Sequence, residues 1–427
     1  MSFGPANASL SLRGIPLIRL LHTADIHLDS PLSSLALKNE ALRETVEAAT
    51  RATFSRLIDF AISEQVLAFL IAGDLFDGKQ RSARTAAFLT GQLGRLRDAK
   101  IRVFYIKGNH DAENPITGAI DLPDNVKVFD AGGGNVQLSE DVWIHGVSFA
   151  DRHAPESLLP RFPKPVSGAV NIAMMHSSLA GTSGHDVYAP CSVADMVGMG
   201  FDYWALGHVH KRQVHSKAPW IVMPGMPQGR DIGEAGPKSA SLLTIENGEI
   251  TVEEVPTSVV EFTQTLLDVT GADSDDTLRS ILRNHLAEVQ TQNTAPTAVL
   301  RLTLTGRPPR YWQILRDRDV WQEQINDLAQ MAGDLWIDKL VFDLAAPVVE
   351  TATASATDEL AATMLDIVTE RGFTSVARAE IDTLLQDLPV GVRARLMPDE
   401  VAADALSHRL AKSGAYRVLA RMKGVET

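Results

Sequence analysis

The stretch that most constrains the fold of this chain is residues 69–78, which read FLIAGDLFDG. A short apolar run bounded by glycine is typical of a buried strand, and here it ends at Asp74, where the chain must turn. A lone carboxylate in such a place is often only a turn or cap residue. Four other segments, however, offer metal-type ligands after similar apolar runs, at residues 25–27, 108–111, 176 and 207–210. Together they predict one shared site.

The first of these segments follows a β-compatible run at residues 16–23. In an extended chain residues i and i+2 point the same way, so Asp25 and His27 can address one cation together. His22 precedes them, and we expect it to pack or to support a ligand rather than to bind metal itself.

Strand and helix patterns alternate through the first quarter of the chain. Apolar residues recur at helical spacing over residues 40–64 and 82–98, and residues 101–106 form another apolar strand. This β-α-β-α-β order predicts right-handed crossovers and a largely parallel sheet. Ligands of such sheets bind at the carboxyl ends of the strands, which is where Asp74 and Asn109 fall.

After residue 111 the helical period fades and short strands separated by turns follow. Two of the apolar runs, which include Met174 and Leu206, are followed within two residues by a histidine, His176 or His208. Ten of the twelve histidines of the chain precede residue 256. We therefore expect a second sheet packed on the first. Its strands are expected near residues 126–129, 142–149, 170–175, 203–206, 220–223, 239–245 and 250–255.

Composition narrows the class of protein. The formal net charge is −13 with a pI near 5.4, whereas nucleic-acid binders are more often basic, although the clustering of charge matters more than its sum. The single cysteine, Cys191, excludes a disulfide framework and fits a reducing cytoplasm; we expect it to be a packing residue. The first 16 residues lack the pattern of a signal peptide, and no apolar run approaches the roughly 18 residues of a membrane span. We expect a soluble, cytoplasmic protein.

The ligand types suggest a chemistry. Two divalent cations about 3.5–4 Å apart can clamp a phosphate and lower the pKa of a water, which requires one bridging carboxylate among mixed nitrogen and oxygen ligands. Asp74 is the natural bridge. Without thiolates the set suits Mn, Fe or Zn, and ligand type alone does not rank these metals. His110 directly follows Asn109, so we expect it to face the substrate, with Asp111 orienting its ring.

These five motifs resemble those of the calcineurin-like metallophosphoesterases. More narrowly, residues 21–27 (LHTADIH) and 72–77 (AGDLFD) are similar to SbcD-type DNA repair nucleases, and residues 25–32, 184–191 and 203–210 are similar to their YhaO branch. The resemblance covers residues 17–256. It implies an α/β sandwich of two sheets flanked by helices, with a small α/β cap and a C-terminal helical segment beyond it.

By the same resemblance, one metal is held by Asp25, His27, Asp74 and His210. The second is held by Asp74, Asn109, His176 and His208. His110 would stabilise the transition state or protonate the leaving oxygen, assisted by Asp111, and the metals would be Mn²⁺. We expect Asp77 to support the metal ligands without binding a metal itself. Asp29 departs from the pattern, because SbcD sequences turn at a glycine there, and this leaves the substrate preference open.

Three further features of the sequence can be explained without a role in binding or catalysis. The triple glycine at residues 132–134 is expected to be a flexible turn, since no phosphate-binding lysine follows it. His185 and Arg230 lie in expected loops, where either a substrate contact or a solvated surface position explains them.

Residues 257–346 are expected to form a capping domain. The pattern predicts strands at 259–269, 298–305 and 335–344 and helices at 275–290 and 312–331. Acidic side chains outnumber basic ones, yet aromatic and cationic residues cluster between Arg307 and Arg318 and can track phosphates and stack on bases. A loop with a solvated helix start explains this cluster equally well. The members of the cluster are Arg307, Arg310, Tyr311, Trp312, Arg316 and Arg318.

Residues 347–427 are expected to form a linker, at 347–357, and a helical arm with helices at 358–370, 375–388 and 398–422. The last helix carries a run of cations without an intervening acid: Arg409, Lys412, Arg417, Arg421 and Lys423. The arm resembles the region by which SbcD-type proteins bind an SMC-like ATPase, SbcC. A solvated face is the alternative.

The sequence thus predicts a dinuclear-metal DNA exonuclease or endonuclease that hydrolyses phosphodiester bonds in DNA repair, with DNA as substrate and an SbcC-like ATPase as partner. Two alternatives stay open: a phosphodiesterase or phosphatase for small nucleotides or other phosphoesters, which the acidic charge suits, and a non-catalytic subunit of an ATPase complex. Some relatives are homodimers, which leaves that assembly open as well.

Overall fold

The computed structural model describes residues 17–30, 40–77, 82–112, 120–179, 188–347 and 356–424. The leader at 1–16, His185 and most of the linker at 347–357 lie outside these residues. The chain divides into two compact units, the first Met1–Thr263 with Asn293–Val299 and the second Gln264–Gln292 with Leu300–Thr427. The three-part division at 17–256, 257–346 and 347–427 stays a prediction.

Unit 1 contains two six-stranded sheets. The first has the order β12-β11-β1-β2-β3-β4, in which β1 to β4 are parallel and β11 and β12 return antiparallel beside β1. These strands are β1 (Ile18–Thr23), β2 (Ala68–Ala72), β3 (Arg102–Ile106), β4 (Val126–Val128), β11 (Ser239–Glu246) and β12 (Glu249–Pro256). The alternating pattern predicted the parallel arrangement of β1 to β3. The expectation that β4, β11 and β12 belong to the second sheet is wrong, because β4 pairs with β3 and β11 pairs with β1.

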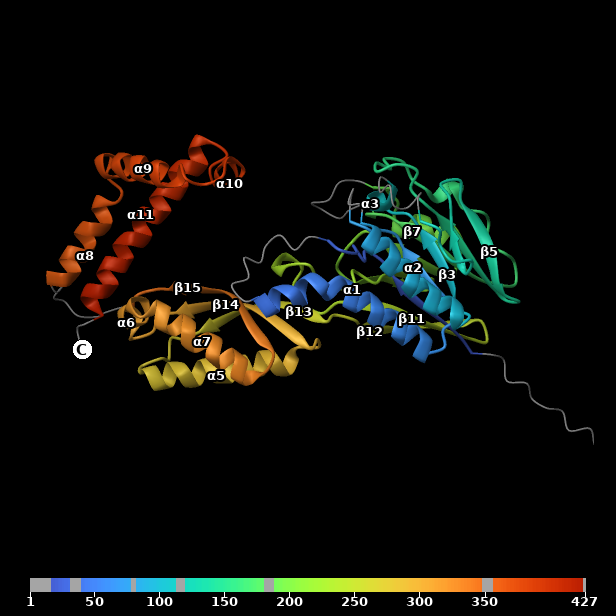
Figure 1. Cartoon of the computed structure of the whole chain (residues 1–427), viewed down its shortest axis with the longest axis horizontal. Helices are drawn as coiled ribbons and strands as arrows, with labels where there is room; N and C mark the ends of the chain where they lie inside the picture. The colour runs from blue at the N-terminus through green and yellow to red at the C-terminus, as the bar shows by residue number, and fades with distance from the viewer. Residues whose placement is uncertain are drawn as a thin grey trace, which may run out of the picture. The chain divides into compact units, whose positions relative to one another are not determined.

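Two long helices, α1 (Glu40–Ser63) and α2 (Ala83–Asp98), lie side by side over one face of this sheet (Figure 1). Helix α2 begins at Ser82, whose hydroxyl accepts a hydrogen bond from the backbone N–H of Thr85. Its leucines at helical spacing are buried against the strands. Both helices lie where the spacing of apolar residues predicted them.

The second sheet has the order β5-β6-β7-β8-β10-β9, with parallel strands in the middle and an antiparallel strand at each edge. Its strands are β5 (Gly134–Ser139), β6 (Val142–Val147), β7 (Val170–His176), β8 (Tyr203–Gly207), β9 (Gln213–Lys217) and β10 (Trp220–Met223). The pattern missed the edge strands β5 and β9. Both are polar and only partly buried, so they carry no apolar run.

The two sheets pack face to face. Leu70 and Phe104 of the first sheet share one fully buried cluster with Ile172 and Met174 of the second. Burying an aliphatic or aromatic side chain of this size stabilises a fold by about 1.5–3 kcal/mol. The outer face of the second sheet is covered by loops and the short helix α4 (Val193–Gly198), with Trp204 in its core. The chain therefore has the predicted α/β architecture of two packed sheets flanked by helices.

Unit 2 contains most of a three-stranded sheet in the order β13-β14-β15, whose first two strands begin in unit 1, and two longer helices that contact each other. The predicted helix at 312–331 is two helices, α6 and α7, which meet at Asp317. The elements are β13 (Val260–Asp268), α5 (Asp275–Gln292), β14 (Thr297–Gly306), α6 (Tyr311–Arg316), α7 (Arg318–Ala332) and β15 (Leu335–Leu344).

The chain ends in four helices. The last and longest, α11, packs against α6, α8 and α9. These helices are α8 (Ala356–Ile367), α9 (Arg371–Leu385), α10 (Val390–Leu396) and α11 (Glu400–Lys423). Among the described residues no helix combines the length and the apolar character that crossing a membrane requires.

Candidate metal centre

The centre is built on loops that follow parallel strands. Asp25 and His27 follow β1 and Asp74 follows β2, and all three have positive φ angles, of 53°, 46° and 51°. Non-glycine residues rarely adopt this left-handed conformation, and they do so mostly where the surrounding structure holds them at a functional site. The loops are joined by backbone hydrogen bonds from Asp25 N to Gly73 O (3.0 Å) and from His27 N to Asp74 O (3.1 Å).

Two glycines make room for this arrangement. Gly73 has φ +93°, and a Cβ there would collide with the ring of His176. A Cβ on Gly108 would collide with the carboxylate of Asp74. The glycines that flank these ligands in the sequence are therefore required by close packing as well as by the turn.

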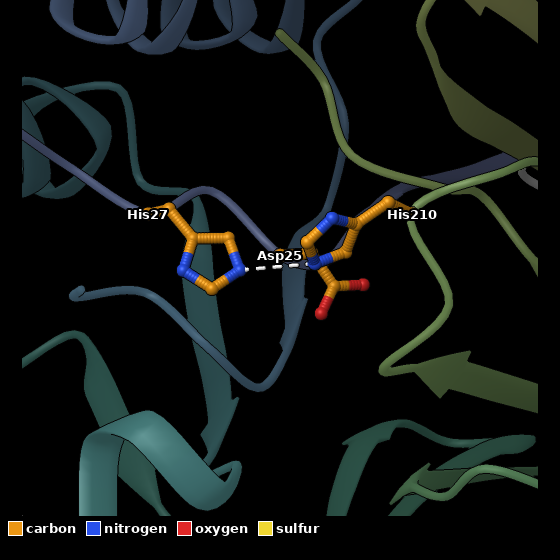
Figure 2. A group of neighbouring side chains, drawn as sticks. All are labelled: Asp25, His27 and His210. Atoms are coloured by element: carbon orange, nitrogen blue, oxygen red, sulfur yellow. Dashed lines mark hydrogen bonds between the residues drawn. The ribbon is translucent and has the colours of Figure 1, made fainter. Parts of the chain in front are cut away.

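Asp25, His27 and His210 form the first group of ligand atoms, all within 4.8 Å of one another (Figure 2). The Nε2 atoms of His27 and His210 face each other at 3.2 Å, and His27 is almost completely buried. Two imidazole lone pairs and a carboxylate directed at one point suit a divalent cation.

Asp25, Asp74 and His176 form a second group of the same kind. The Nδ1 atom of His176 lies 2.9 Å from Ala72 O, to which it donates, so that Nε2 faces the site. That Nε2 lies 3.2 Å from Asn109 Oδ1 and 3.3 Å from His208 Nδ1. The structure thus brings together all seven predicted ligands, which were drawn from five segments of the chain. Their role as ligands stays a prediction.

The electrostatics of the centre favour the charged forms of Asp74 and His176 despite burial. Burial opposes the charge on Asp74, but His176, His27 and His110 outweigh it and hold the pKa of this carboxyl below its ordinary range. Burial also opposes protonation of His176, yet Asp74 and Asp25 raise the pKa of that imidazole to about 9. A buried carboxylate that attracts positive charge so strongly fits a cation site. Oxygen and imidazole donors without a thiolate suit divalent metals, and they do not choose among them.

His110 lies at the edge of this cluster. It follows β3 in the short helix α3 (Asn109–Ala112), and its side chain is 34% exposed. Its backbone N–H donates to Asp74 Oδ1 at 2.9 Å, and its Nδ1 lies 3.5 Å from Asp77 Oδ1. Asp77 also lies 3.6 Å from His27 Nδ1, and the interaction with His27 lowers the pKa of Asp77 to about 2. Asp77 is therefore an ionised carboxylate between two site histidines.

Asp111 is fully buried and has a different environment. Its carboxylate accepts hydrogen bonds from the backbone N–H groups of Phe76 (3.0 Å) and Gly108 (3.1 Å). Burial and the neighbouring Asp74 raise its pKa to about 6. The carboxylate thus braces the two loops that carry Asp74 and Asn109. Its expected role in orienting the His110 ring stays a prediction, and Asp77 offers a second carboxylate for that role.

The sequence interpretation missed Glu234, which ends the 3₁₀ turn Ile232–Glu234. Its Oε1 lies 2.7 Å from His210 Nδ1, and the Arg230 guanidinium donates to it at 2.8 Å. Burial disfavours its charge, but His210 and Arg230 hold the pKa of Glu234 below its usual range. The sequence left both a surface position and a substrate contact open for Arg230. The structure places Arg230 in the hydrogen-bond network of Glu234 and His210. No local pattern links Glu234 to His210, which is 24 residues away.

Asp29, which stands where SbcD-type sequences have a glycine, adopts a φ angle of 58°. Its carboxylate receives a hydrogen bond from Arg51 Nε at 2.6 Å and another from the hydroxyl of Thr85. Aspartate tolerates the left-handed conformation better than most residues, and these bonds anchor it. The turn is therefore kept without glycine.

A groove of about 610 Å³ opens beside His210 within unit 1. Three cationic residues line it, Lys211, Arg212 and Lys238, together with Glu234 and Glu254. His210, a candidate ligand, also lines this groove, and the cations of the groove suit an anionic substrate.

Two other residues have structural roles, as expected. His22 is fully buried, with Nδ1 2.9 Å from the Tyr203 hydroxyl and Nε2 3.1 Å from Leu206 O. Burial lowers its pKa to about 3. Cys191 is buried in the core on the outer face of the second sheet.

Comparison with known proteins adds two family matches. Residues 18–212 match the calcineurin-like phosphoesterases, and residues 262–345 match the middle domain of the metallophosphoesterase YhaO. The first range contains all seven candidate ligands, whereas Glu234 lies beyond it.

Three curated relatives are similar over different lengths. The chain is 34% identical over 300 residues to the uncharacterized metallophosphoesterase YhaO of Bacillus subtilis, covering 69% of this chain and 73% of the relative. It is 24% identical over 357 residues to the DNA double-strand break repair protein Mre11 of Sulfurisphaera tokodaii, covering 76% and 87%. Over 96 residues it is 34% identical to a subunit of the nuclease SbcCD of Rhodobacter capsulatus, covering 22% of each chain.

Proposed function

Since this chain belongs to the calcineurin-like metallophosphoesterase family, a family of phosphoester hydrolases, we propose that it is a DNA nuclease of the SbcD type that cleaves phosphodiester bonds in DNA repair. Two relatives support the choice of DNA, one named as a DNA double-strand break repair protein and the other as part of a nuclease. The observation that carries the proposal is the partly exposed His110 beside seven candidate ligands, of which five are buried and two, His208 and His210, are partly buried.

In this proposal Asp25, His27, Asp74 and His210 hold one divalent cation, and Asp74, Asn109, His176 and His208 hold the other. When bound, the two cations act as Lewis acids toward the phosphate and lower the pKa of a water. Manganese is our proposed metal.

Hydrogen-bond acceptors next to the ligands fix the orientation of two histidine rings. Glu234 accepts the Nδ1 proton of His210, and Ala72 O accepts that of His176, so both rings direct their other nitrogen at the metal. Asp25 also accepts the backbone N–H of His208 at 3.0 Å, which ties the loop after β8 to the loop after β1.

His110 is proposed to act on the substrate. Asp77, 3.5 Å from Nδ1, orients the ring so that Nε2 faces the phosphate or the leaving oxygen, and Nε2 acts there when it also carries a proton. The same ring either stabilises the charge of the transition state or donates a proton to the leaving group. Cations of the groove beside His210 would hold the flanking phosphates.

We propose that the helices α8 to α11 dock an SbcC-like ATPase. Nine large apolar side chains of α9, α10 and α11 are exposed: Phe373, Val376, Leu384, Val390, Leu396, Val401, Leu410, Val418 and Met422. An apolar groove of about 380 Å³ also runs between α8, α9 and α11. Apolar surface of this extent on a soluble protein commonly marks an interaction site. DNA and such a partner imply a cytoplasmic protein, which the single cysteine suits.

The test of the function is cleavage of end-labelled linear duplex DNA in the presence of Mn²⁺, beside a chromogenic phosphodiester. His110→Gln serves as the control for contaminating nucleases. We expect the wild type to cleave both substrates and the variant to cleave neither at a comparable rate, and the label then reports the polarity.

The two alternatives give different results in this assay. Cleavage of the small diester without cleavage of DNA, even with an SbcC-like ATPase added, would favour an enzyme for small nucleotides. No cleavage of either substrate by protein loaded with metal would favour a non-catalytic subunit.

A further inference from the structure

The aromatic and cationic cluster of residues 307–318 is mostly used inside unit 2. Arg307 Nη1 donates to Ala346 O at 2.9 Å, Arg310 pairs with Asp275 at 3.0 Å, and Arg316 pairs with Asp317 at 2.6 Å. Tyr311 is buried, and Trp312 stacks on Tyr416 of α11. These side chains hold unit 2 together and are poor candidates for a surface that follows a nucleic acid.

Arg318 is the exception. Its guanidinium lies 4.7 Å from the centre of the Phe342 ring, and its side chain is partly buried. Across the part of the chain that the structure describes, no carboxylate lies within 4.0 Å of it. Stacking on an aromatic ring fixes the orientation of the planar guanidinium group, but it supplies no hydrogen-bond acceptors for the N–H groups.

Arg318 lines a cavity of about 350 Å³. The α7 and β15 side supplies Arg318 and Phe342, and the facing helix α11 supplies Lys412, Tyr416 and Arg417. All of these residues belong to unit 2. The sequence placed Arg318 and Arg417 in two unrelated cationic runs, and only folding brings them to one cavity.

Charge in this cavity is unbalanced. Burial lowers the pKa of Arg318, and the neighbouring Arg417 lowers it further, because two positive charges oppose each other. Asp343 lines the cavity and Asp319 lies beside Arg318, yet no ion pair within 4.0 Å joins a described carboxylate to Arg318, Lys412 or Arg417. Like charges held together without a counter-ion repel each other, which costs free energy.

We propose that this cavity is a binding site for a phosphate group. The guanidiniums of Arg318 and Arg417 form the two walls of the anion site, and Lys412 adds a third charge at its rim. A phosphate accepts forked hydrogen bonds from arginine and brings the negative charge that the cavity lacks. The Tyr311 hydroxyl, which burial and Tyr416 keep protonated by raising its pKa to about 12, lines the same cavity.

The phosphate can belong to a nucleic-acid strand or to a small polyphosphate. Both present the same oxygen atoms, so the experiment uses one probe of each kind. The site is formed by unit 2 alone and does not depend on the proposed nuclease activity.

The test is isothermal titration calorimetry of the full-length protein, stripped of metal, with sodium tripolyphosphate and with a short oligothymidylate. The variant is Arg318→Gln/Arg417→Gln. The matched control is Arg409→Gln/Arg421→Gln, which removes two exposed arginines of the same helix that do not line the cavity. We expect the variant to bind at least one probe about tenfold more weakly or worse, and the control to change affinity by less than about twofold.

Each outcome has a definite meaning. Loss of tripolyphosphate binding alone identifies a small phosphate ligand, and loss of oligothymidylate binding, with or without loss of tripolyphosphate binding, identifies a strand. Equal affinity in variant and control, or no binding of either probe to the wild type, overturns the site. Hydrolysis of the chromogenic diester with Mn²⁺, assayed on the same preparations, should be unchanged by either pair of substitutions. It therefore reports on the proposed function separately.

Discussion

The Nδ1 atom of His210 lies 2.7 Å from Oε1 of Glu234, and this contact fixes which ring nitrogen is available to a metal. The other nitrogen, Nε2, faces His27 Nε2 at 3.2 Å. Glu234 in turn receives the Arg230 guanidinium. An ionised carboxylate behind a histidine ligand orients the ring and increases its basicity.

Glu234→Gln should therefore weaken metal binding. The amide still accepts a hydrogen bond but lacks the charge, and we expect metal affinity or activity to fall by about 10- to 100-fold. Equilibrium dialysis with Mn²⁺ measures this. Glu254→Gln is the control, because Glu254 lines the same groove and pairs with Arg212 instead. Equal affinities in the two variants would remove Glu234 from the site.

Asp74→Ala should abolish binding of both metals, because this carboxylate is the proposed bridge and contacts ligands of each group. Elemental analysis of protein dialysed against Mn²⁺ measures the bound metal. Asp151→Ala, a substitution on the surface, should retain it. A fully loaded Asp74→Ala protein would disprove the bridging assignment.

His110→Gln should keep both metals and lose about 10²- to 10⁴-fold in kcat, as the removal of a general acid does. Steady-state hydrolysis of the chromogenic diester gives the rate, and elemental analysis gives the metal content. His408→Gln, which changes an exposed histidine of α11, is the control. A turnover equal to that of the control would end the proposed role of His110.

Asp77→Asn and Asp111→Asn should have different effects. Asp77 contacts the rings of His110 and His27, so its loss should lower kcat by about 10- to 100-fold. Asp111 accepts two backbone N–H groups, and an amide cannot replace both carboxylate oxygens as an acceptor. Its substitution should lower the unfolding temperature. If only Asp111→Asn lowers kcat at a saturating Mn²⁺ concentration, then Asp111 is the carboxylate that serves His110.

The stability of the fold should fall on acidification, in part because of His22. Burial lowers its pKa from 6.5 to about 3, so below about pH 6.5 the unfolded chain binds a proton that the native protein does not. The His22 contribution is thus complete above pH 6.5 and decreases by about 1.4 kcal/mol per pH unit toward pH 3.

Urea unfolding of metal-free protein near pH 7.5 and pH 5 measures this. The wild type should lose about 2 kcal/mol more than His22→Gln between the two conditions. The same loss in both proteins would contradict the prediction.

Local sequence determined most of the elements and the candidate ligands. Asp25, Asp74 and His176 each follow an apolar strand, and a buried strand with a polar residue at its end is a pattern of neighbouring residues. Helices α1 and α2 were visible for the same reason. Strands β5 and β9 were not, because they lie at sheet edges and lack an apolar run. The break of one predicted helix at Asp317 was missed as well.

Tertiary structure alone decided which partners surround those residues. Glu234 behind His210, Asp77 beside His110, and Arg318 facing Arg417 are pairs whose members are distant in the chain or belong to separate motifs. Their meeting depends on how the loops and helices pack, and no local periodicity encodes it. The sequence therefore determined which residues offer ligand atoms, because strand ends are a local property. Only the tertiary structure decided which charged side chains form ion pairs and which remain available to a ligand, because an ion pair depends on the distance between its two members in space.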